Sequence, residues 1–386
     1  MEYLFLLGRN IKLSLAEIFS YLEKNKIKLI NFYLASNGVL IDVDKELDIN
    51  KAINDLGGTI AIGNISFQGD IDKIIKEISE KEIYFGVSNK LNYTIFNFCD
   101  EISFEKVYSA MKSNFKKERL KSRYHPLRGD LKMQDGDALL GSPSSLAKLG
   151  AKYFLFKTDK YFFGTFDEVY NTIESEKRDM ERPLRREELA ISPRLSKILI
   201  NLSQVKENEI LLDPFCGVGA IIQEALLQNI NVVGVDADEK AVKNCNLNIS
   251  WLKKNYKIDS KYEILNSNSI KAKLKKIDGI VTEPSLGKLL RKIPSEKEAQ
   301  KMISNFENLI IAVLNNIKKY LKIEGKIAFT SPFIKTVNKR IGINIRKIIE
   351  KTGLKSYEIN NAVFPIEEFK EGQIVGRKIF VLIKSV

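Results

Sequence analysis

The chain has 386 residues, of which 44% are hydrophobic and 29% are charged, a composition that fits a folded protein of two or three domains and excludes a disordered one. Its formal net charge of +13 raises the expectation of a polyanionic partner, meaning nucleic acid or an anionic membrane surface. Three widely spaced cysteines and a single histidine argue against a disulfide-stapled secreted fold, a zinc site and a Ser-His-Asp hydrolase.

Residues 1–70 predict a small ferredoxin-like α+β module. A capping-box pattern from Ser14 to Glu17 predicts the start of a helix, and Ser36-Asn37-Gly38 is typical of a hairpin turn. The predicted elements are strand 3–7, helix 14–23, strands 32–35 and 39–43, helix 50–56 and strand 59–67. The first residues carry no basic leader, and no apolar run nears the roughly 20 residues of a membrane span, so we expect a cytoplasmic protein.

Residues 71–168 predict a second α+β region. Apolar residues recur at helical spacing between residues 101 and 117. The predicted elements are helices 71–78 and 101–117 and strands 83–87, 93–97, 153–156 and 161–166. Residues 169–190 are densely charged and poor in core residues, which indicates a linker between domains.

From residue 191 to residue 386, strands and helices alternate. The predicted helices are 193–202, 220–228, 239–251, 299–321 and 344–352, and the predicted strands are 209–213, 231–236, 262–266, 279–282, 325–330, 355–364 and 378–384. Alternation of this kind predicts a Rossmann-like, doubly wound and mostly parallel sheet. The closing strands predict an antiparallel edge, so the sheet is expected to be mixed.

The most informative stretch follows the first strand of this alternating region. Asp213 ends the strand, and Gly217 and Gly219 form a Gly-x-Gly turn before a helix, at the sheet edge where open α/β folds bind ligands. A dinucleotide site is disfavoured, because Ile222 replaces its third glycine and Asp213 would repel a pyrophosphate. An acid there suits a sulfonium, and Asp236 at the end of the second strand can accept both ribose hydroxyls.

Together these residues predict a site for S-adenosylmethionine. A lone Gly-x-Gly pattern would be weak evidence, but the two flanking acids make it more specific. The structural alternative is that Asp213 caps the following helix and that Asp236 is a solvated strand end. No metal is expected at this site.

The fourth strand of the alternating region ends in Glu283-Pro284-Ser285-Leu286-Gly287. With this segment, the catalytic half resembles the class I aminomethyltransferases, and within them the THUMP-domain tRNA guanine-N2 methyltransferases. The resemblance covers about half of the chain strongly, and the N-terminal half by position and order. It implies that residues 71–168 are a THUMP-like RNA-binding domain. The similar segments are Asp213–Gly219, Ser192–Leu202, Arg178–Pro183 and Leu6–Glu17.

The resemblance implies roles for individual residues. The family motif is Asp/Asn-Pro-Pro-Tyr/Phe, whose acid and following carbonyl accept hydrogen bonds from the substrate NH2 group. Here the acid is a glutamate, and a serine and a leucine replace the second proline and the aromatic that stacks on the base. Phe333 or Phe364 could replace that aromatic. The implied catalytic residues are Glu283, Pro284, Ser285 and Leu286, and the implied cofactor-binding residues are Asp213, Phe215, Gly217, Gly219, Asp236, Ala237, Asn268 and Glu283.

Two open alternatives concern this site. Asn268 stands where the family usually has an aspartate that meets the adenine amino group, and it could equally form an Asx turn. The segment around Glu283 could belong to a homologue that has lost activity and only binds tRNA. The same motif also serves N6-adenine and N4-cytosine methyltransferases acting on RNA or DNA.

Basic residues cluster in two places. Residues 106–132 hold nine Lys or Arg against two acids, which favours contact with RNA phosphates over a merely solvated helix face. A second cluster, between residues 271 and 292, is expected to flank Glu283 and to steer RNA towards it. The resemblance makes tRNA the expected partner, recognised by its shape. The candidate RNA-binding residues are Lys116, Lys117, Arg119, Lys121, Arg123, Arg128, Lys288, Arg291 and Lys292.

Overall fold

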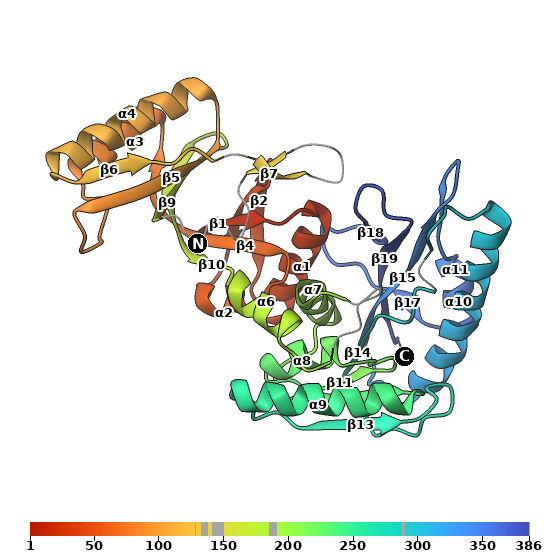
Figure 1. The fold of residues 1–386 in the computed structure, drawn as a ribbon. Coiled ribbons are helices and arrows are strands. Elements are labelled where there is room, and N and C mark those ends of the chain that lie inside the picture. The colour runs from red at the N-terminus through yellow and green to blue at the C-terminus, as the bar shows by residue number, and fades with distance from the viewer. Residues whose placement is uncertain (128, 133–137, 141–149, 185–190, 288–289, 386) are drawn as a thin grey trace. The chain divides into compact units, whose positions relative to one another are not determined.

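The computed structural model describes residues 1–127, 129–132, 138–140, 150–184, 191–287 and 290–385 (Figure 1). Two of the predicted RNA-binding residues, Arg128 and Lys288, lie outside these described residues. The chain divides into two compact units. Unit 1 comprises Met1–Ile11, Ile27–Asn54 and Gly58–Ile173, and unit 2 comprises Lys12–Lys26, Asp55–Gly57 and Glu174–Val386.

Unit 1 is built on an eight-stranded sheet of order β2-β3-β1-β4-β10-β9-β5-β6. Its elements are β1 (Glu2–Leu7), β2 (Leu29–Ala35), β3 (Gly38–Val43), α2 (Ile49–Asp55), β4 (Thr59–Gly69), α3 (Ile71–Glu80), β5 (Lys90–Phe98), α4 (Glu101–Lys117), β6 (Lys121–Tyr124), β7 (Gly129–Lys132), β8 (Ala138–Leu140), β9 (Ala151–Lys157) and β10 (Tyr161–Val169). The antiparallel order of the first four strands is the ferredoxin-like order predicted from the sequence. The THUMP-like assignment and the domain boundaries at residues 70, 168 and 190 stay predictions.

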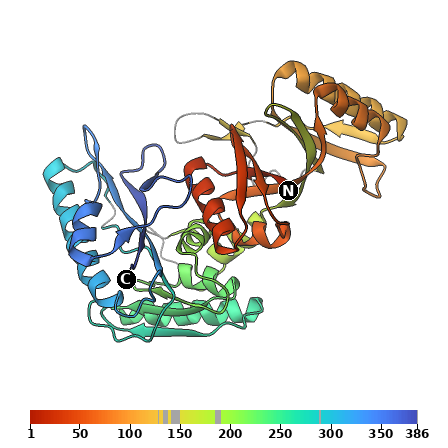
Figure 2. The ribbon, with the colours of Figure 1, turned by 180° about the vertical axis from the view of Figure 1, so that it is seen from behind.

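Alternation along the strands gives this sheet two apolar faces. On β9, Tyr153 and Leu155 belong to a core formed with α3 and α4, whereas Phe154 and Phe156 belong to a second core formed with β1, β3 and β4. Figure 2 shows α3 and α4 side by side against the same sheet face. The predicted strand at residues 83–87 is wrong: Ile83 is buried in the first core, but the segment pairs with no strand in the described chain.

Unit 2 is built on a sheet whose main path runs β13-β12-β11-β14-β15-β19-β17. Its elements are α1 (Ile11–Lys24), α6 (Thr172–Met180), α7 (Pro193–Ser203), β11 (Ile210–Asp213), α8 (Ala220–Leu227), β12 (Asn231–Asp236), α9 (Glu239–Asn255), β13 (Tyr262–Asn266), β14 (Gly279–Thr282), α10 (Glu296–Ile317), β15 (Lys326–Lys335), β16 (Arg340–Ile341), α11 (Ile345–Thr352), β17 (Lys355–Ser356), β18 (Ile366–Glu368) and β19 (Val375–Ile383). The strands from β13 to β15 are parallel and β19 is antiparallel, which confirms the predicted mixed, mostly parallel sheet.

Helices α10 and α11 cover one face of this sheet and bury a large apolar core with it (Figure 1). Helix α10 begins with a capping box in which Ser295 and Glu298 exchange hydrogen bonds, so the backbone N–H groups of these two residues are satisfied. The predicted strand at residues 355–364 is wrong in extent. Only Lys355–Ser356 pairs with β19, and the next short strand, β18, begins at Ile366.

Helix α1 belongs to unit 2, although it lies near the start of the chain. It begins at Ile11, three residues before the predicted capping box, and Glu17 does not act as part of a cap. The buried Glu17 carboxylate accepts hydrogen bonds from Gly57 N and from Asn201 Nδ2 on α7, both at 2.8 Å. Asn201 also accepts from Lys24 Nζ at 2.9 Å and, through its carbonyl, from Ser20 at 2.8 Å. These bonds join α1 to α7.

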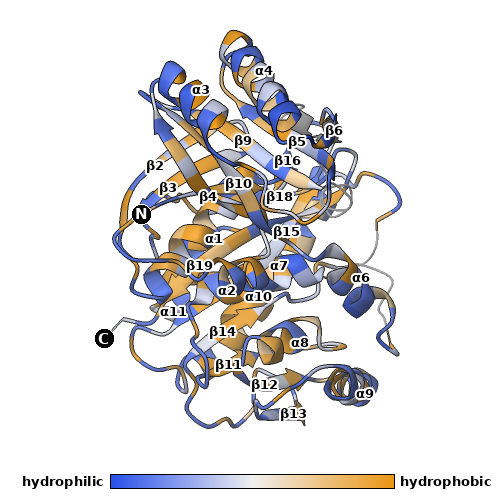
Figure 3. Cartoon of the chain, turned by 90° about the vertical axis from the view of Figure 1, so that its left-hand side faces the viewer, coloured by the Kyte–Doolittle hydropathy of each residue, from blue (hydrophilic) through white to orange (hydrophobic). Residues whose placement is uncertain are grey.

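The charged segment predicted as a linker contains helix α6. Arg178 on this helix donates from Nε to Oε1 of Glu224 on α8 at 2.8 Å, and both side chains are almost fully buried. Figure 3 shows α6 as largely hydrophilic, in contrast to α1. The helix is therefore attached to unit 2 by a buried ion pair and not by an apolar face.

Candidate active site

Three carboxylates lie at the carboxyl ends of three neighbouring strands in unit 2. Asp213 ends β11, Asp236 ends β12 and Glu283 directly follows β14, and β11 pairs in parallel with both β12 and β14. The chain crosses from one side of β11 to the other here, so this is the point where the strand order reverses. Ligands of open α/β sheets bind at such a point.

The Gly-x-Gly turn joins two of these strand ends. Gly217 and Gly219 have φ angles of +52° and +87°, values that other residues adopt only with strain. Gly217 N donates to Asp236 Oδ2 at 2.9 Å, so the turn is tied to the end of β12. A Cβ atom at Gly219 would lie 2.7 Å from the Cys245 sulfur, so the site also lacks room for a side chain there.

Asp213 is buried and is held by two donors. Thr282 Oγ1 and Phe215 N donate to its Oδ1 at 2.7 and 3.1 Å. The pKa of Asp213 is raised to about 7. Burial is the main cause and the charges of Asp236 and Glu283 add to it, whereas the two hydrogen bonds lower the pKa. A carboxyl with this pKa gains charge near neutral pH and would be held ionised by a nearby cation.

Asp236 keeps acceptor capacity on both carboxylate oxygens. Oδ2 accepts from Gly217 N, and Oδ1 accepts from Asp238 N at 2.9 Å, which leaves one lone pair on each oxygen. Asn268 uses its Oδ1 to accept from Ile270 N at 3.0 Å, which is an Asx turn. This bond uses one lone pair of the oxygen, so a second lone pair and the amide NH2 group of the exposed Asn268 stay available to a ligand. Ala237 is exposed beside Asp236, and Phe215 packs against the core of unit 2.

The Glu283 carboxylate has partners that no sequence pattern suggested. Arg377 on β19 donates from Nε to Oε2 at 2.6 Å and from Nη2 to Oε1 at 2.9 Å. Thr330 on β15 donates to Oε2 at 3.0 Å. The side chains of Arg377 and Glu283 are 13% and 7% exposed, so this is a nearly buried bidentate ion pair.

The rest of the motif is divided between surface and interior. Pro284 and Leu286 are buried, Leu286 being 3% exposed, whereas Ser285 is exposed. Leu286 therefore offers no surface on which a base could stack. Phe333 is no open platform either: it is 6% exposed, and Lys378 Nζ lies 4.1 Å from its ring centre. Phe364 is half-buried.

The cysteine of the turn is unsuited to nucleophilic attack. A hydrogen bond with Cys245 and burial raise the pKa of the Cys216 thiol well above its usual range, so the thiol stays protonated. All three cysteines are free thiols. Among the residues that the structure describes, no three His, Cys, Asp or Glu side chains gather in a way that could hold a metal ion.

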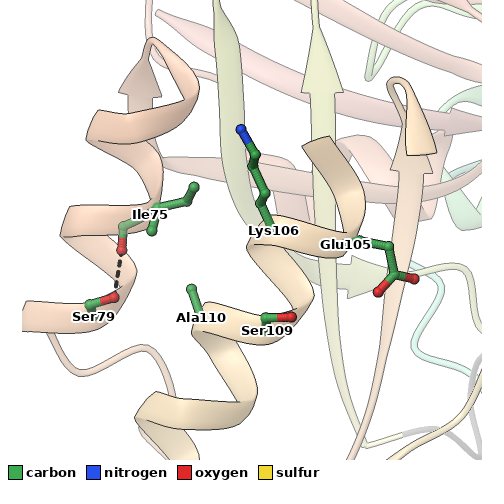
Figure 4. Close-up of a pocket in the computed structure, with 6 residues that line it drawn as sticks. All are labelled: Ile75, Ser79, Glu105, Lys106, Ser109 and Ala110. Atoms are coloured by element: carbon green, nitrogen blue, oxygen red, sulfur yellow. Dashed lines mark hydrogen bonds between the residues drawn. The ribbon is translucent and has the colours of Figure 1, made fainter. Parts of the chain in front are cut away.

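The basic residues of unit 1 form an exposed group at one end of α4 and on the neighbouring strand. Lys116 and Lys117 close α4, Arg119 follows it in a left-handed turn, and Lys121 and Arg123 lie on β6; all five are exposed. A pocket of about 570 Å³ lies between α3 and α4 and is lined partly by Lys106 (Figure 4). It contains none of the residues predicted for the cofactor.

The predicted position of the second basic cluster, around Glu283, is wrong in part. Lys275 and Lys276 directly precede Ile277 and lie at the amino end of β14, whereas Glu283 follows its carboxyl end. These lysines therefore do not flank Glu283. Arg291 and Lys292, which follow the motif in sequence, are exposed, and their contact with RNA stays a prediction. None of the helices in the described part of the chain has both the length and the apolar character that a membrane crossing demands.

Comparison with known proteins places this chain among methyltransferases. A family described as "RMKL-like, methyltransferase domain" matches residues 182–341, and one described as "DNA methylase" matches residues 70–247. TrmN from Thermus thermophilus superposes with a TM-score of 0.51 at 13% identity, and 100% of both chains is covered. At this identity the likeness shows the fold alone.

Curated relatives carry a more specific name. The tRNA (guanine(10)-N2)-dimethyltransferase of Methanothermobacter thermautotrophicus is 38% identical over 99 residues, which are 25% of this chain and 28% of that protein. The protein of the same name from Methanocaldococcus jannaschii is 32% identical over 148 residues, or 36% and 37% of the two chains. The "Probable tRNA (guanine(10)-N2)-dimethyltransferase" of Methanothermococcus thermolithotrophicus is 30% identical over 146 residues, covering 36% of this chain and 79% of that protein. The chain thus spans about a third of the length of the first two.

Proposed function

The chain belongs to the family of class I tRNA guanine-N2 methyltransferases, and from this premise we propose that it transfers a methyl group from S-adenosylmethionine to the exocyclic N2 amine of a guanine in tRNA. The observation that carries the proposal is the set of three acids, Asp213, Asp236 and Glu283, at neighbouring strand ends around a Gly-x-Gly turn. Bound S-adenosylmethionine supplies the electrophilic methyl group, and the protein binds and orients. The proposed place of action is the cytoplasm.

Each acid has a separate task in this proposal. Asp236 offers its two free lone pairs to the ribose hydroxyls, and the buried Asp213 faces the cationic part of the cofactor. Gly217 leaves room for the ligand, because a Cβ atom there would meet no atom within 4 Å. Glu283 accepts a hydrogen bond from the substrate amine and so aligns its nitrogen lone pair with the methyl group. Positioning of this kind can supply most of the rate enhancement.

RNA contacts are proposed for the exposed basic residues of unit 1 and for Arg291 and Lys292. Lys116, Lys117 and Arg119 would bind phosphates at the end of α4, and Lys121 and Arg123 would extend that contact along β6. Such contacts position an RNA without reading its bases. The target guanine must leave its stack to reach Glu283, as in other enzymes that modify bases.

The proposal is tested by incubating the protein with methyl-labelled S-adenosylmethionine and unmodified bulk tRNA, and then digesting the RNA to nucleosides. We expect label in N2-methylated guanosine. Guanine 10 is the first position to map, because the relatives are named for it. Label absent from guanosine would contradict the proposal.

Two other functions have an observation in their favour. The match to a family described as "DNA methylase" favours methylation of adenine N6 or cytosine N4, which would place the label on those nucleosides. Ser285 and the buried Leu286, which stand in place of the family's second proline and stacking aromatic, favour a tRNA-binding homologue with impaired chemistry. That protein would bind tRNA in the same assay and transfer no label.

A pH dependence follows from Asp213. An unperturbed aspartate ionises near pH 3.9, so between about pH 4 and 7 the folded protein holds a proton on Asp213 that the unfolded chain has lost. This group therefore stabilises the free protein at low pH, and that contribution is lost as the pH rises through 7. A cationic ligand needs the ionised form. We expect S-adenosylmethionine to bind about tenfold more weakly at pH 6 than at pH 8.

Titration calorimetry at a series of pH values measures this effect. Asp213→Asn is the matched control, because it keeps the side-chain shape and cannot titrate. Its affinity should be low and should lack the step near pH 7 that Asp213 causes. Equal pH dependence in both proteins would assign the effect to another group.

A further inference from the structure

Arg377 and Thr330 converge on the acid of the proposed transfer site. We infer that they are positioning residues, which hold the Glu283 carboxylate in one orientation so that a single oxygen lone pair receives the substrate amine. The inference rests on the proposed function and deepens it. Neither residue belongs to the motif that suggested the site, and each reaches Glu283 from another strand.

Counting acceptor sites shows why the orientation is specific. Each carboxylate oxygen has two lone pairs. Oε2 uses both, because it accepts from Arg377 Nε at 2.6 Å and from Thr330 Oγ1 at 3.0 Å. Oε1 uses one, for Arg377 Nη2 at 2.9 Å. The remaining lone pair of Oε1 is thus the side-chain acceptor left for an incoming amine.

The fold places Arg377 at this point through strand pairing. In the antiparallel β15–β19 pair, Arg377 lies opposite Pro332 and Thr330 lies opposite Ile379. Thr330 therefore sits on β15, which pairs with β14, and Arg377 sits on β19, the strand beyond β15, while Glu283 directly follows β14. A short donor such as Thr330 and a long one such as Arg377 can reach the same carboxylate from these positions, and the extra methylene of glutamate extends it towards them.

The chemistry of the pair suits a fixed orientation. A guanidinium presents its donors in a rigid fork that matches a carboxylate, whereas an ammonium would act as a point charge. Burial lowers the pKa of Arg377, but the hydrogen bonds and the charge of Glu283 outweigh it, so its pKa is raised overall. Arg377 therefore stays charged and keeps its donors on the Glu283 carboxylate. Glu368 is a further acid whose charge acts on Arg377.

The test compares Arg377→Met, Arg377→Lys and wild type in tRNA methyl transfer. We expect Arg377→Met to lower kcat by about 10²-fold, the cost of misplacing a reacting group by about 1 Å. The KM for tRNA and the Kd for S-adenosylmethionine, measured by calorimetry without turnover, should change less than about threefold, because Arg377 contacts neither ligand in this proposal. Arg377→Lys should recover part of kcat, since it restores the charge without the fork.

A matched control separates positioning from stability. Lys322 pairs with Glu209 and Asp278, which precede β11 and β14, at the opposite ends of those strands from the site. Lys322→Met should lower the thermal midpoint while leaving kcat of the folded protein near that of wild type. A double variant, Glu283→Arg with Arg377→Glu, keeps an ion pair with the two charges exchanged. It should have a thermal midpoint near that of wild type and remain inactive.

Several outcomes would overturn the inference. A kcat for folded Arg377→Met equal to that of wild type, or a Lys variant no more active than the Met variant, would make the ion pair structural. A loss confined to KM or to cofactor affinity would place Arg377 in binding. These outcomes leave the proposed function intact. Absence of methyl transfer by the wild-type protein would contradict both the proposed function and the positioning role of Arg377.

Discussion

Replacing Glu283 with glutamine should lower kcat for methyl transfer by about 10²–10³-fold, the cost typical of removing one precisely placed polar contact from an active site. Glutamine has the same length, but it is neutral and carries an NH2 group. In the wild-type protein, two donors of Arg377 and one of Thr330 bind the two carboxylate oxygens of Glu283. The amide can satisfy them with one oxygen only, so the acceptor offered to the substrate is lost or turned away. Single-turnover transfer to tRNA measures this effect.

The cofactor affinity of this variant should stay close to that of wild type, since the ribose and sulfonium contacts are assigned to other acids. Alanine is a poorer choice at this position. It would leave the Arg377 guanidinium buried without the carboxylate to which it is hydrogen-bonded, which costs about 3–5 kcal/mol of stability. The double variant Glu283→Leu with Arg377→Met replaces the pair by apolar side chains and should be stable but inactive. Wild-type turnover in Glu283→Gln would remove Glu283 from the mechanism.

Replacing Asp236 with alanine should raise the Kd for S-adenosylmethionine by about 10²-fold. Two hydrogen bonds from ribose hydroxyls to a carboxylate contribute about 1.5–3 kcal/mol each in favourable cases, and part of this is recovered by water. The change also frees the N–H groups of Gly217 and Asp238, which now donate to Asp236, so the turn loses its anchor. Both effects weaken binding before any chemistry takes place. Titration calorimetry in the absence of tRNA isolates them.

Asp238→Ala is the matched control for this prediction. Asp238 lies two residues further along the chain, is exposed, and caps α9 by accepting from Lys240 N at 2.9 Å. Its removal costs a helix cap of about 1 kcal/mol but no proposed ligand contact, so the Kd should hold within about threefold. If Asp236→Ala and Glu283→Gln lost cofactor affinity equally, the division of roles between the two acids would be refuted.

Much of this fold could be predicted because its elements are locally encoded. Helix 101–117 has the predicted bounds, and strands 231–236, 262–266 and 279–282 also agree, since apolar periodicity and turn residues delimit them. The positions of Asp213, Asp236 and Glu283 at strand ends followed from the same pattern. Once parallel strands are assigned, their carboxyl ends must share one edge of the sheet.

The predictions fail where contacts between residues far apart in sequence determine the structure. Arg377 is 94 residues from Glu283 in sequence, and only the antiparallel β15–β19 pairing brings them together. The Ser14–Glu17 pattern resembles a cap, but Glu17 is used by Gly57 and Asn201 inside unit 2. The predicted strand at 83–87 was a misreading of apolar residues: Ile83 is buried, and its carbonyl accepts from the Tyr153 hydroxyl at 2.9 Å instead of joining a strand ladder.

The place of α1 restricts how the gene for this protein could be rearranged. A break after residue 173 would separate α1 from the α7 face on which it is bound, and Asn201 would lose its bonds from Lys24 and Ser20 and its bond to Glu17. Each polar group left buried without a partner costs about 1–3 kcal/mol. The segments before and after residue 173 are therefore not independent domains that could be exchanged separately. A recombination event that moved the methyltransferase half alone into another protein would have to carry residues 12–26 with it.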